Sequence, residues 1–519
     1  MKNSSFFKNS FVLTLSNITT GLLAFIFSIY LSKLIGPEGI GLYGLVMPIY
    51  NLFICLMTAG IIAAISQVSA IYKAKGNYTN INKTIKTVAM FNIIWALIIG
   101  ITVFFLAPYI SKFGIHDMRT VNAIRVTCPA MIFISLSNIL KGYFYGVSKI
   151  TIPSFIDILE KALRILIIAL LIYIFKAKTI TSLVTLAYVS LAIGELQSLI
   201  LLFFYYQKVK KSMPISHDKP ERISQLLFNV FIIALPLCLN GFLGNLFGTA
   251  SALLVPRRLI ASGFDSSVAL AMIGKFNGMA LTIVTFPMIV IMSINSLIIP
   301  DLSETLSRKD YYSATTRIKK VMKIAFLLGL ATLIVCNIIP DSLGKMFFSR
   351  DDLGNYIRIA SFSMPVLFTA MTMYGILNGL NKQGVILKNS LIVSVLELIC
   401  LFVLVGNNAI NIMGYGITMF ITSCISLYLN LREVKKHIDL NLSSANIFIF
   451  LLLSILLFLT LRVMANTLLA NYFIFKNLVI ITITFATFII LSFFGIQEEW
   501  WKLTYIESMN LHIIILQEQ

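Results

Sequence analysis

The stretch SAIYKAKGNYTNINKTIKTV, residues Ser69 to Val88, is a basic segment between two long apolar runs. A second stretch, SETLSRKDYYSATTRIKKVM at Ser303 to Met322, occupies the equivalent place in the second half of the chain. Two further matches recur at almost the same offset in residue number: Ile124-Arg125 with Ile357-Arg358, and Gly142-x-x-x-Gly146-x-x-Lys149 with Gly375-x-x-x-Gly379-x-x-Lys382. This near-constant spacing predicts two copies of one structural unit, with close helix packing at the paired glycines.

Apolar runs on both sides of these segments decide the environment of the chain. Of 519 residues, 58% are apolar and 12% are charged, against about 45–50% and about 25% in soluble domains. Runs long enough to cross a bilayer, about 20 residues each, lie at about 11–35, 42–71, 87–107, 121–146, 154–175, 180–206, 226–254, 268–299, 320–340, 355–380, 388–406, 412–431, 444–465 and 474–496. The sequence therefore predicts an all-α integral membrane protein with about 14 transmembrane helices.

The duplication and the apolar runs together predict the domain organisation. Residues 1–225 form an N-terminal lobe of six transmembrane helices, and residues 226–440 form a C-terminal lobe of six. An even number of helices per copy makes the lobes parallel repeats, related by pseudo-symmetry about an axis along the membrane normal. Residues 441–496 add two further helices, and residues 497–519 form an interfacial or cytoplasmic tail.

The excess of positive charge, 41 Lys and Arg against 21 Asp and Glu, is explained by orientation in the membrane. If the N-terminus is cytoplasmic, 24 of the 41 bases fall on the cytoplasmic side, in agreement with the positive-inside rule. We therefore expect a multi-pass protein of the cell membrane with both termini in the cytoplasm. Its expected partners include membrane lipids and exclude nucleic acid, because most of the bases serve orientation.

Motifs for catalysis or metal binding are absent from the sequence. The four histidines are distant from one another, at His116, His217, His437 and His512, and the six cysteines lie in separate apolar runs. There is no phosphate-binding G-x-x-x-x-G-K-[ST] loop, and neither H-E-x-x-H nor G-x-S-x-G occurs. We expect no enzyme activity, no cofactor, no metal site and no disulfide.

Charged residues inside the apolar runs are the candidate functional groups, because each costs at least about 2.5–3.5 kcal/mol at mid-bilayer. The densest group has the spacing i, i+3, i+4 and i+7 on the fifth run: Asp157, Glu160, Lys161 and Arg164. This spacing puts all four on one helical face and predicts pairing of Asp157 with Lys161 and of Glu160 with Arg164. The sequence leaves two interpretations open: a self-neutralised stripe, or a cavity wall that offers Lys161 or Arg164 to an anionic head group.

Three further charges stand alone in apolar runs. Glu195 and Glu397 are candidates for proton or cation coupling or for hydrogen bonding between helices, and Asp157 and Glu160 join them as ion-coupling candidates. Lys275 lies about two turns into its run. We expect it to face a cavity, because from this depth a lysine reaches the membrane interface less readily than one at a helix end.

Two stretches carry a family resemblance: LSKLIGPEGIGLYGLVMPIYNL at Leu31 to Leu52, and FNGMALTIVTFPMIVIMSINSLIIPDLSE at Phe276 to Glu304. They resemble the stage V sporulation protein B group. This group belongs to the polysaccharide exporters of the multidrug/oligosaccharidyl-lipid/polysaccharide flippase superfamily. The resemblance covers essentially the whole chain, including the repeat and the two additional C-terminal helices.

The resemblance implies a flippase whose two lobes alternate access to a central cavity. The implied cargo is an undecaprenyl-pyrophosphate-linked peptidoglycan precursor for the spore cortex, moved from the inner to the outer leaflet. The resemblance puts the first, second, seventh and eighth helices at the interface between the lobes. The substrate-cavity candidates on these helices are Asn17, Thr20, Gln67, Asn240, Asn245, Lys275 and Asn277, beside Lys161 and Arg164 from the fifth.

One departure from the family bears on the cargo. Gram-negative lipid II flippases carry arginines on their first two helices, whereas Ser16 to Thr20 and Asn51 to Cys55 contain none. A cationic head-group site must therefore be built elsewhere in this chain.

Three alternatives to this function remain open. The first is an exporter of another lipid-linked wall or capsular oligosaccharide, and the second is a cation-coupled multidrug antiporter of the same superfamily. The third belongs to a different class, a membrane scaffold that recruits wall synthases without transport. Peptidoglycan synthases are accordingly a further candidate partner.

Overall fold

The computed structural model describes residues 2–58, 60–214, 221–438, 440, 444–467 and 473–492. Over these residues the chain is helical, with short 3-10 and π-helical segments and no β-strand. The all-α prediction is therefore confirmed. The predicted tail at 497–519 lies outside the described residues.

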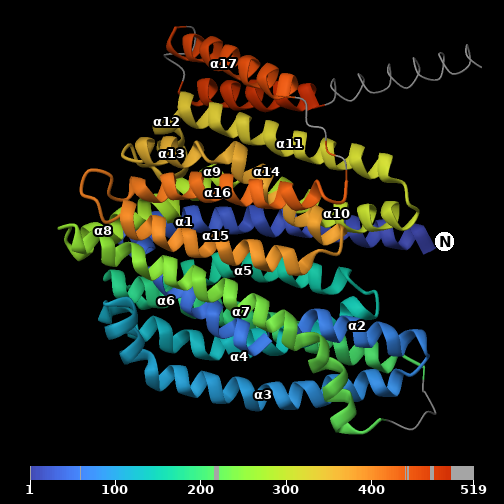
Figure 1. The fold of residues 1–519 in the computed structure, drawn as a ribbon. Helices are drawn as coiled ribbons and strands as arrows, with labels where there is room; N and C mark the ends of the chain where they lie inside the picture. The colour runs from blue at the N-terminus through green and yellow to red at the C-terminus, as the bar shows by residue number, and fades with distance from the viewer. Residues whose placement is uncertain are drawn as a thin grey trace, which may run out of the picture. The chain divides into compact units, whose positions relative to one another are not determined.

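The described residues group into two compact units, and Figure 1 labels most of their helices. The first comprises Met1–Thr282 and Ser390–Thr418, and the second comprises Ile283–Asn389 and Met419–Gln519. The elements up to the end of α9 are α1 (Lys2–Thr58), α2 (Ile61–Ala74), α3 (Tyr78–Tyr109), η1 (Ile110–Ile115), η2 (Met118–Thr120), α4 (Val121–Gly146), α5 (Thr151–Phe175), α6 (Ile180–Lys211), α7 (Ile223–Ala261), α8 (Ser266–Ile273), η3 (Gly274–Ala280) and α9 (Leu281–Thr285).

The remaining elements run from α10 to the end of the described chain. They are α10 (Met288–Ser307), α11 (Tyr311–Ile338), α12 (Pro340–Phe348), α13 (Gly354–Ser361), α14 (Met364–Gly379), α15 (Gln383–Leu404), α16 (Met413–Val434), α17 (Ser444–Asn466) and a last helix over Phe473–Ser492. The predicted lobe boundaries at 225 and 440 rest on the sequence repeat and stay a prediction.

By length and apolar composition, 12 of the described helices can cross a membrane, or up to 13 when the bent pair α13 and α14 counts as one span. The predicted count of 14 is not confirmed, because some predicted spans merge, one divides and one carries too many charges. The first two predicted spans run together as Val12–Ala74, bent at Gly36 with φ 69°. The predicted span 268–299 divides in two between α9 and α10. Helix α5 falls outside the count because it carries four charged residues.

The backbone repeats at the offset found in the sequence. Left-handed turns pair at one constant offset in residue number: Gly76 with Lys309, His116 with Ser349, and Ser148 with Asn381. At the start of α3, the Asn77 side chain accepts a hydrogen bond from the Asn80 N–H at 2.9 Å. Asp310, the equivalent of Asn77 in the second copy, accepts one from the Ser313 N–H at 3.0 Å. Because non-glycine residues rarely adopt positive φ, these shared turns confirm that one structural unit occurs twice.

The paired glycines mark the closest helix contacts within each copy. A Cβ on Gly142 of α4 would lie 2.9 Å from the Ile62 carbonyl oxygen of α2, and one on Gly146 would lie 2.6 Å from that of Ser66. The second copy repeats both contacts at the equivalent positions, between α14 and α10: Gly375 with Asn295, and Gly379 with Ile299. The predicted close packing at both motifs is therefore confirmed.

The apolar core of the first unit surrounds α4, which packs against α2, α3 and α6. Tyr143 and Phe144 of α4 are fully buried there with Ile65 and Leu202. In the second unit, α11 packs against α14 and α17. Figure 1 shows the last helix, Phe473–Ser492, beside α17, and Leu330 of α11, Leu461 of α17 and Phe488 of the last helix share one apolar cluster. In the first unit, polar side chains of α4, α5 and α6 line a separate cavity.

Candidate functional site

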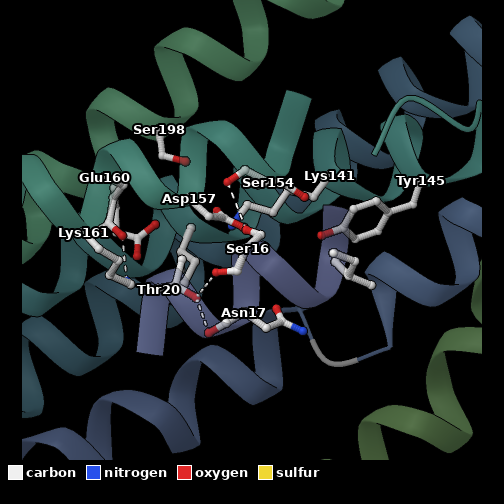
Figure 2. Close-up of a pocket in the computed structure, with 13 residues that line it drawn as sticks. Ser16, Asn17, Thr20, Lys141, Tyr145, Ser154, Asp157, Glu160, Lys161 and Ser198 are labelled. Carbon is white, nitrogen blue, oxygen red and sulfur yellow. Dashed lines mark hydrogen bonds and ion pairs between the residues drawn. The ribbon is translucent and has the colours of Figure 1, made fainter. Parts of the chain in front are cut away.

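A polar cavity of about 230 Å³ lies among α1, α4, α5 and α6 of the first unit. Its wall is formed by Leu13, Ser16, Asn17, Thr20, Ile134, Lys141, Tyr145, Ser154, Asp157, Glu160, Lys161, Glu195 and Ser198 (Figure 2). Five of these side chains are charged, three acidic and two basic. A cavity of this polarity within apolar helices has room and hydrogen-bonding partners for water or an ion.

The charged face of α5 lines this cavity, but its pairing differs from the predicted i, i+4 pairs. Asp157 pairs with Lys141 of α4, with 2.7 Å between Nζ and Oδ1. Lys161 pairs with the adjacent Glu160, with 2.6 Å between Nζ and Oε2. The predicted pairs of Asp157 with Lys161 and of Glu160 with Arg164 are therefore wrong. The reason is tertiary: α4 brings an ammonium group to Asp157, which leaves Lys161 to Glu160.

Arg164 lies one turn beyond the cavity wall and is enclosed by α1. Its Nη2 donates to the Tyr43 hydroxyl at 3.0 Å, and its guanidinium lies over the Phe27 ring, 4.5 Å from the centroid. The side chain is buried. In this conformation Arg164 is not presented to a ligand in the cavity.

Glu195 of α6 contributes a third carboxylate to the cavity wall. It is buried, and in the described part of the chain it forms no ion pair. The residue before it, Gly194, lets the Glu160 carboxylate lie against α6, because a Cβ there would be 2.9 Å from Glu160 Oε1. The two glutamates thus approach each other from α5 and α6.

Helix α1 closes the cavity with small polar residues. Ser16 donates a hydrogen bond to the Ser154 carbonyl oxygen of α5 at 3.2 Å, and the Thr20 hydroxyl donates to the Ser16 carbonyl at 2.9 Å. Figure 2 shows these residues and Asn17 opposite the charged face of α5. Asn17, Thr20, Lys161 and the acids on α5 and α6 were expected at functional positions, and the fold brings them together.

The other predicted substrate-cavity residues lie elsewhere in the first unit, away from this cavity wall. Gln67 is exposed on α2, and Asn240 and Asn245 are half-buried on α7. Lys275 and Asn277 are half-buried on the π-helical segment η3, which packs against α1.

The remaining ion-coupling candidate is also outside the cavity wall. Glu397 lies on α15 and shares a hydrogen bond with Ser251 of α7. The structure therefore brings together three of the four predicted ion-coupling acids, and Glu397 has a separate environment.

Sequence reasoning missed five polar residues of the cavity wall: Ser16, Lys141, Tyr145, Ser154 and Ser198. Lys141 could have been identified from the sequence, because it is a single base inside an apolar run and such a charge needs a partner. The serines and Tyr145 could not have been identified in this way, because isolated hydroxyls are common in membrane helices.

Among the described residues, no group of three His, Cys, Asp or Glu side chains is arranged to hold a metal ion. The cavity offers two ion pairs and the hydroxyl groups of its serines, Thr20 and Tyr145. Because both of its bases are paired with carboxylates, it presents little positive charge to an anionic head group.

Comparisons with known proteins extend over most of the chain. Residues 6–306 match the model of a family described as polysaccharide biosynthesis protein. The chain is 24% identical over 445 residues to stage V sporulation protein B of Bacillus subtilis (strain 168), covering 85% of this chain and 86% of that protein. It is 21% identical over 419 residues to the lipid II flippase MurJ of the same organism, covering 76% and 77%.

A solved structure of a lipid II flippase MurJ in an inward closed conformation has the same fold, with a TM-score of 0.72 at 12% identity over 94% of this chain and 99% of that one. The fold is also shared with a multidrug transporter of the MATE family of the MOP superfamily, in an inward-facing conformation, with a TM-score of 0.61 at 16% identity over 82% of this chain and 95% of that one. The lipid II flippase thus occurs both among the relatives in sequence and among the solved structures of the same fold. The family model matches more than half of the chain, which belongs to the polysaccharide biosynthesis protein family.

Proposed function

We propose that this protein is a flippase that moves an undecaprenyl-pyrophosphate-linked peptidoglycan precursor from the inner to the outer leaflet of the cell membrane, for synthesis of the spore cortex. The observation that carries this proposal is the likeness to stage V sporulation protein B along 445 residues. The likeness to a lipid II flippase in sequence and in fold supports the same cargo class.

The physical need for such a protein comes from the cargo itself. A pyrophosphate and its sugars would lose their hydration in the bilayer, at a cost of tens of kcal/mol for an unpaired charge. A duplicated bundle of helices can enclose the head group while the prenyl tail remains in lipid. Alternating access of the two lobes then moves the head group without exposing it to hydrocarbon.

The cargo-facing candidates under this proposal remain Asn17, Thr20, Gln67, Lys161, Arg164, Asn240, Asn245, Lys275 and Asn277. Lys161 and Arg164 are engaged by Glu160 and Tyr43 in this conformation, so they could meet a phosphate only after a rearrangement. Lys275 is the candidate we favour for the pyrophosphate, since its η3 segment packs against α1 and π-helical segments occur frequently at functional sites.

Ion coupling is assigned to acids within the membrane. Asp157, Glu160, Glu195 and Glu397 are the candidates, and three of them line the cavity. Both termini lie in the cytoplasm under this proposal, and peptidoglycan synthases would use the precursor after it crosses.

The test uses the purified protein in vesicles that contain a fluorescent lipid-linked peptidoglycan precursor. An impermeant reagent that quenches the head group reports how much cargo has crossed. We expect cargo from the inner leaflet to become quenchable at a rate well above that in protein-free vesicles, and more slowly for Lys275→Ala. The control is Lys345→Ala, because Lys345 lies outside the apolar runs with an exposed side chain.

Each other result identifies a different function. A rate equal to that of protein-free vesicles contradicts this cargo, and movement of another lipid-linked oligosaccharide would then assign the protein to that polymer. Dye efflux that is lost in Glu397→Gln would favour a multidrug antiporter. No transport of any kind, with wall assembly lost on deletion, would favour a scaffold for synthases.

A further inference from the structure

Helix α6 ends in a basic segment that continues one of its exposed apolar faces. This face carries four residues at intervals of four, four and three: Ile200, Phe204, Lys208 and Lys211. Ile200 is 58% exposed and Phe204 is 63% exposed, and both lysines are exposed as well. In a membrane helix such an apolar face contacts acyl chains, and lysines at its end extend their ammonium groups to the level of the lipid head groups.

The first turns of α3 have the same arrangement. Lys86 is exposed, and its helical spacing puts it on one face with Met90, Ile93 and Leu97. These three apolar side chains are exposed, Met90 by 66%. Lys86 lies about two turns into the helix, so its ammonium group reaches the head groups by extending along this apolar surface.

The two basic segments lie close together at one edge of the first unit. Helix α4 packs against both α3 and α6, and the Tyr206 hydroxyl of α6 donates a hydrogen bond to Asn82 Oδ1 of α3 at 3.2 Å. Lys86 follows Asn82 by one turn, and Lys208 follows Tyr206 by two residues. The ammonium groups of both helices therefore gather around this contact.

The three lysines have no acidic partner among the described residues. None of the ion pairs in the described part of the chain includes them, and Glu221, at the same end of the unit, is bound by Tyr72 and Asn80. The second unit pairs several of its bases with acids, at Arg308, Arg317 and Lys436. Orientation in the membrane requires only that bases lie on the cytoplasmic side, so it explains neither the missing partners nor the shared face with exposed apolar residues.

A ligand that fits this edge has both an anionic head group and acyl chains. Ammonium groups donate charge-assisted hydrogen bonds to phosphate oxygens, and bases beside a membrane surface attract anionic lipids. The exposed faces of α3 and α6 that lead up to the lysines need apolar contacts in addition. An acidic protein segment or a soluble anion would satisfy the charges but not these faces, which favours a lipid.

We propose that Lys86, Lys208 and Lys211 bind the head group of an anionic phospholipid in the cytoplasmic leaflet, with its acyl chains along the exposed faces of α3 and α6. The leaflet follows from the orientation predicted by the positive-inside rule. This lipid is a component of the bilayer and not the cargo, so the inference goes beyond the flippase function proposed above and does not depend on it.

The test measures quenching of a tryptophan by brominated phospholipids in phosphatidylcholine vesicles that contain the purified full-length protein. The reporter variant carries Phe204→Trp, one turn before Lys208, together with Trp95→Phe, Trp500→Phe and Trp501→Phe, which remove the three native tryptophans. Bromine atoms in acyl chains quench a tryptophan only at short range, so the quenching reports which lipid occupies this edge. We expect brominated phosphatidylglycerol at a low mole fraction to quench several-fold more than brominated phosphatidylcholine.

Two triple variants of the reporter protein locate the site. Replacing the three lysines together, by Lys86→Gln, Lys208→Gln and Lys211→Gln, should abolish the preference for phosphatidylglycerol. The matched control removes the same charge from the second unit, by Lys382→Gln, Lys388→Gln and Lys435→Gln, and should retain the preference. An equal loss in both triple variants, or no preference in the reporter protein itself, would overturn the site.

Two further measurements keep the proposal testable. If the first triple variant does not fold, the reporter protein is measured in rising salt, which should weaken the preference by screening; a preference that salt leaves unchanged would reject the proposal. Added lipid-linked peptidoglycan precursor should not relieve the quenching by brominated phosphatidylglycerol, and relief would assign this edge to cargo instead. Flipping without the lipid preference, or the preference without flipping, separates this inference from the proposed function.

Discussion

At the scale of single residues, the ion pairs of the cavity depend on which helix supplies the partner. Asp157 is matched by Lys141 across a helix boundary, at 2.7 Å. Residue spacing within α5 could place Asp157 on the correct face, but it could not identify that partner. Both side chains retain some exposure, 29% for Asp157 and 15% for Lys141, so water screens the pair only in part.

The first residue-scale prediction concerns this pair. Lys141→Met should lower the free energy of unfolding by about 1–3 kcal/mol, below the 3–5 kcal/mol of a fully buried pair, because Asp157 is left without its counterion. Adding Asp157→Leu to Lys141→Met should recover most of the loss. Denaturant unfolding of both variants in detergent provides the measurement. Equal losses in the single and double variants would show that the pair is not coupled.

The second residue-scale prediction concerns Gly194. A Cβ at this position would lie 2.9 Å from Glu160 Oε1, so Gly194→Ala should displace the Glu160 carboxylate and lower the free energy of unfolding by about 1–3 kcal/mol through overpacking, as measured by denaturant unfolding in detergent. The control is Gly244→Ala, because a Cβ there meets no atom within 4 Å. Equal free energies of unfolding for Gly194→Ala and Gly244→Ala would show that the Glu160 carboxylate does not pack closely against α6.

At the scale of elements, the paired glycines of the two copies differ in how closely the neighbouring helix approaches them. Gly146 of α4 faces the backbone of α2, where a Cβ would lie 2.6 Å from the Ser66 oxygen. Its equivalent, Gly379 of α14, meets the side chain of Leu302 at 3.1 Å. The backbone oxygen of Ile299 is 3.3 Å away, so an added methyl group meets its neighbours at longer distances in the second copy than in the first.

We therefore predict that Gly146→Ala costs about 1–3 kcal/mol of stability through overpacking and that Gly379→Ala costs clearly less. Thermal unfolding of the two variants, followed by helical circular dichroism, compares the copies directly. A larger loss for Gly379→Ala would contradict the packing seen in the two units.

At the scale of the whole molecule, the distribution of bases predicts its orientation. Lys75 follows α2 and Lys178 follows α5, and both are exposed. The positive-inside rule puts Lys75 in the cytoplasm and Lys178 outside. In a cysteine-free background, an impermeant maleimide added to intact cells should label Lys178→Cys and spare Lys75→Cys. Labelling only of Lys75→Cys would reverse the assigned topology.

Much of this protein is determined by the sequence alone. The apolar runs require membrane helices because backbone groups in lipid must bond within one segment. Sequence matches at a near-constant offset predict the duplication that the turns at Ser148 and Asn381 confirm. The charges of α5 were identifiable as functional candidates for an energetic reason, their cost in lipid.

The tertiary structure decided which partner each of these charges has. Periodicity along a helix assigns a side chain to a face, since it depends only on local geometry. The partner on that face comes from another helix, and helix packing sets its identity. Lys141 thus neutralises Asp157 and Lys161 neutralises Glu160, whereas Arg164 is enclosed by Tyr43 and Phe27 of α1, so neither pair predicted from the spacing within α5 forms.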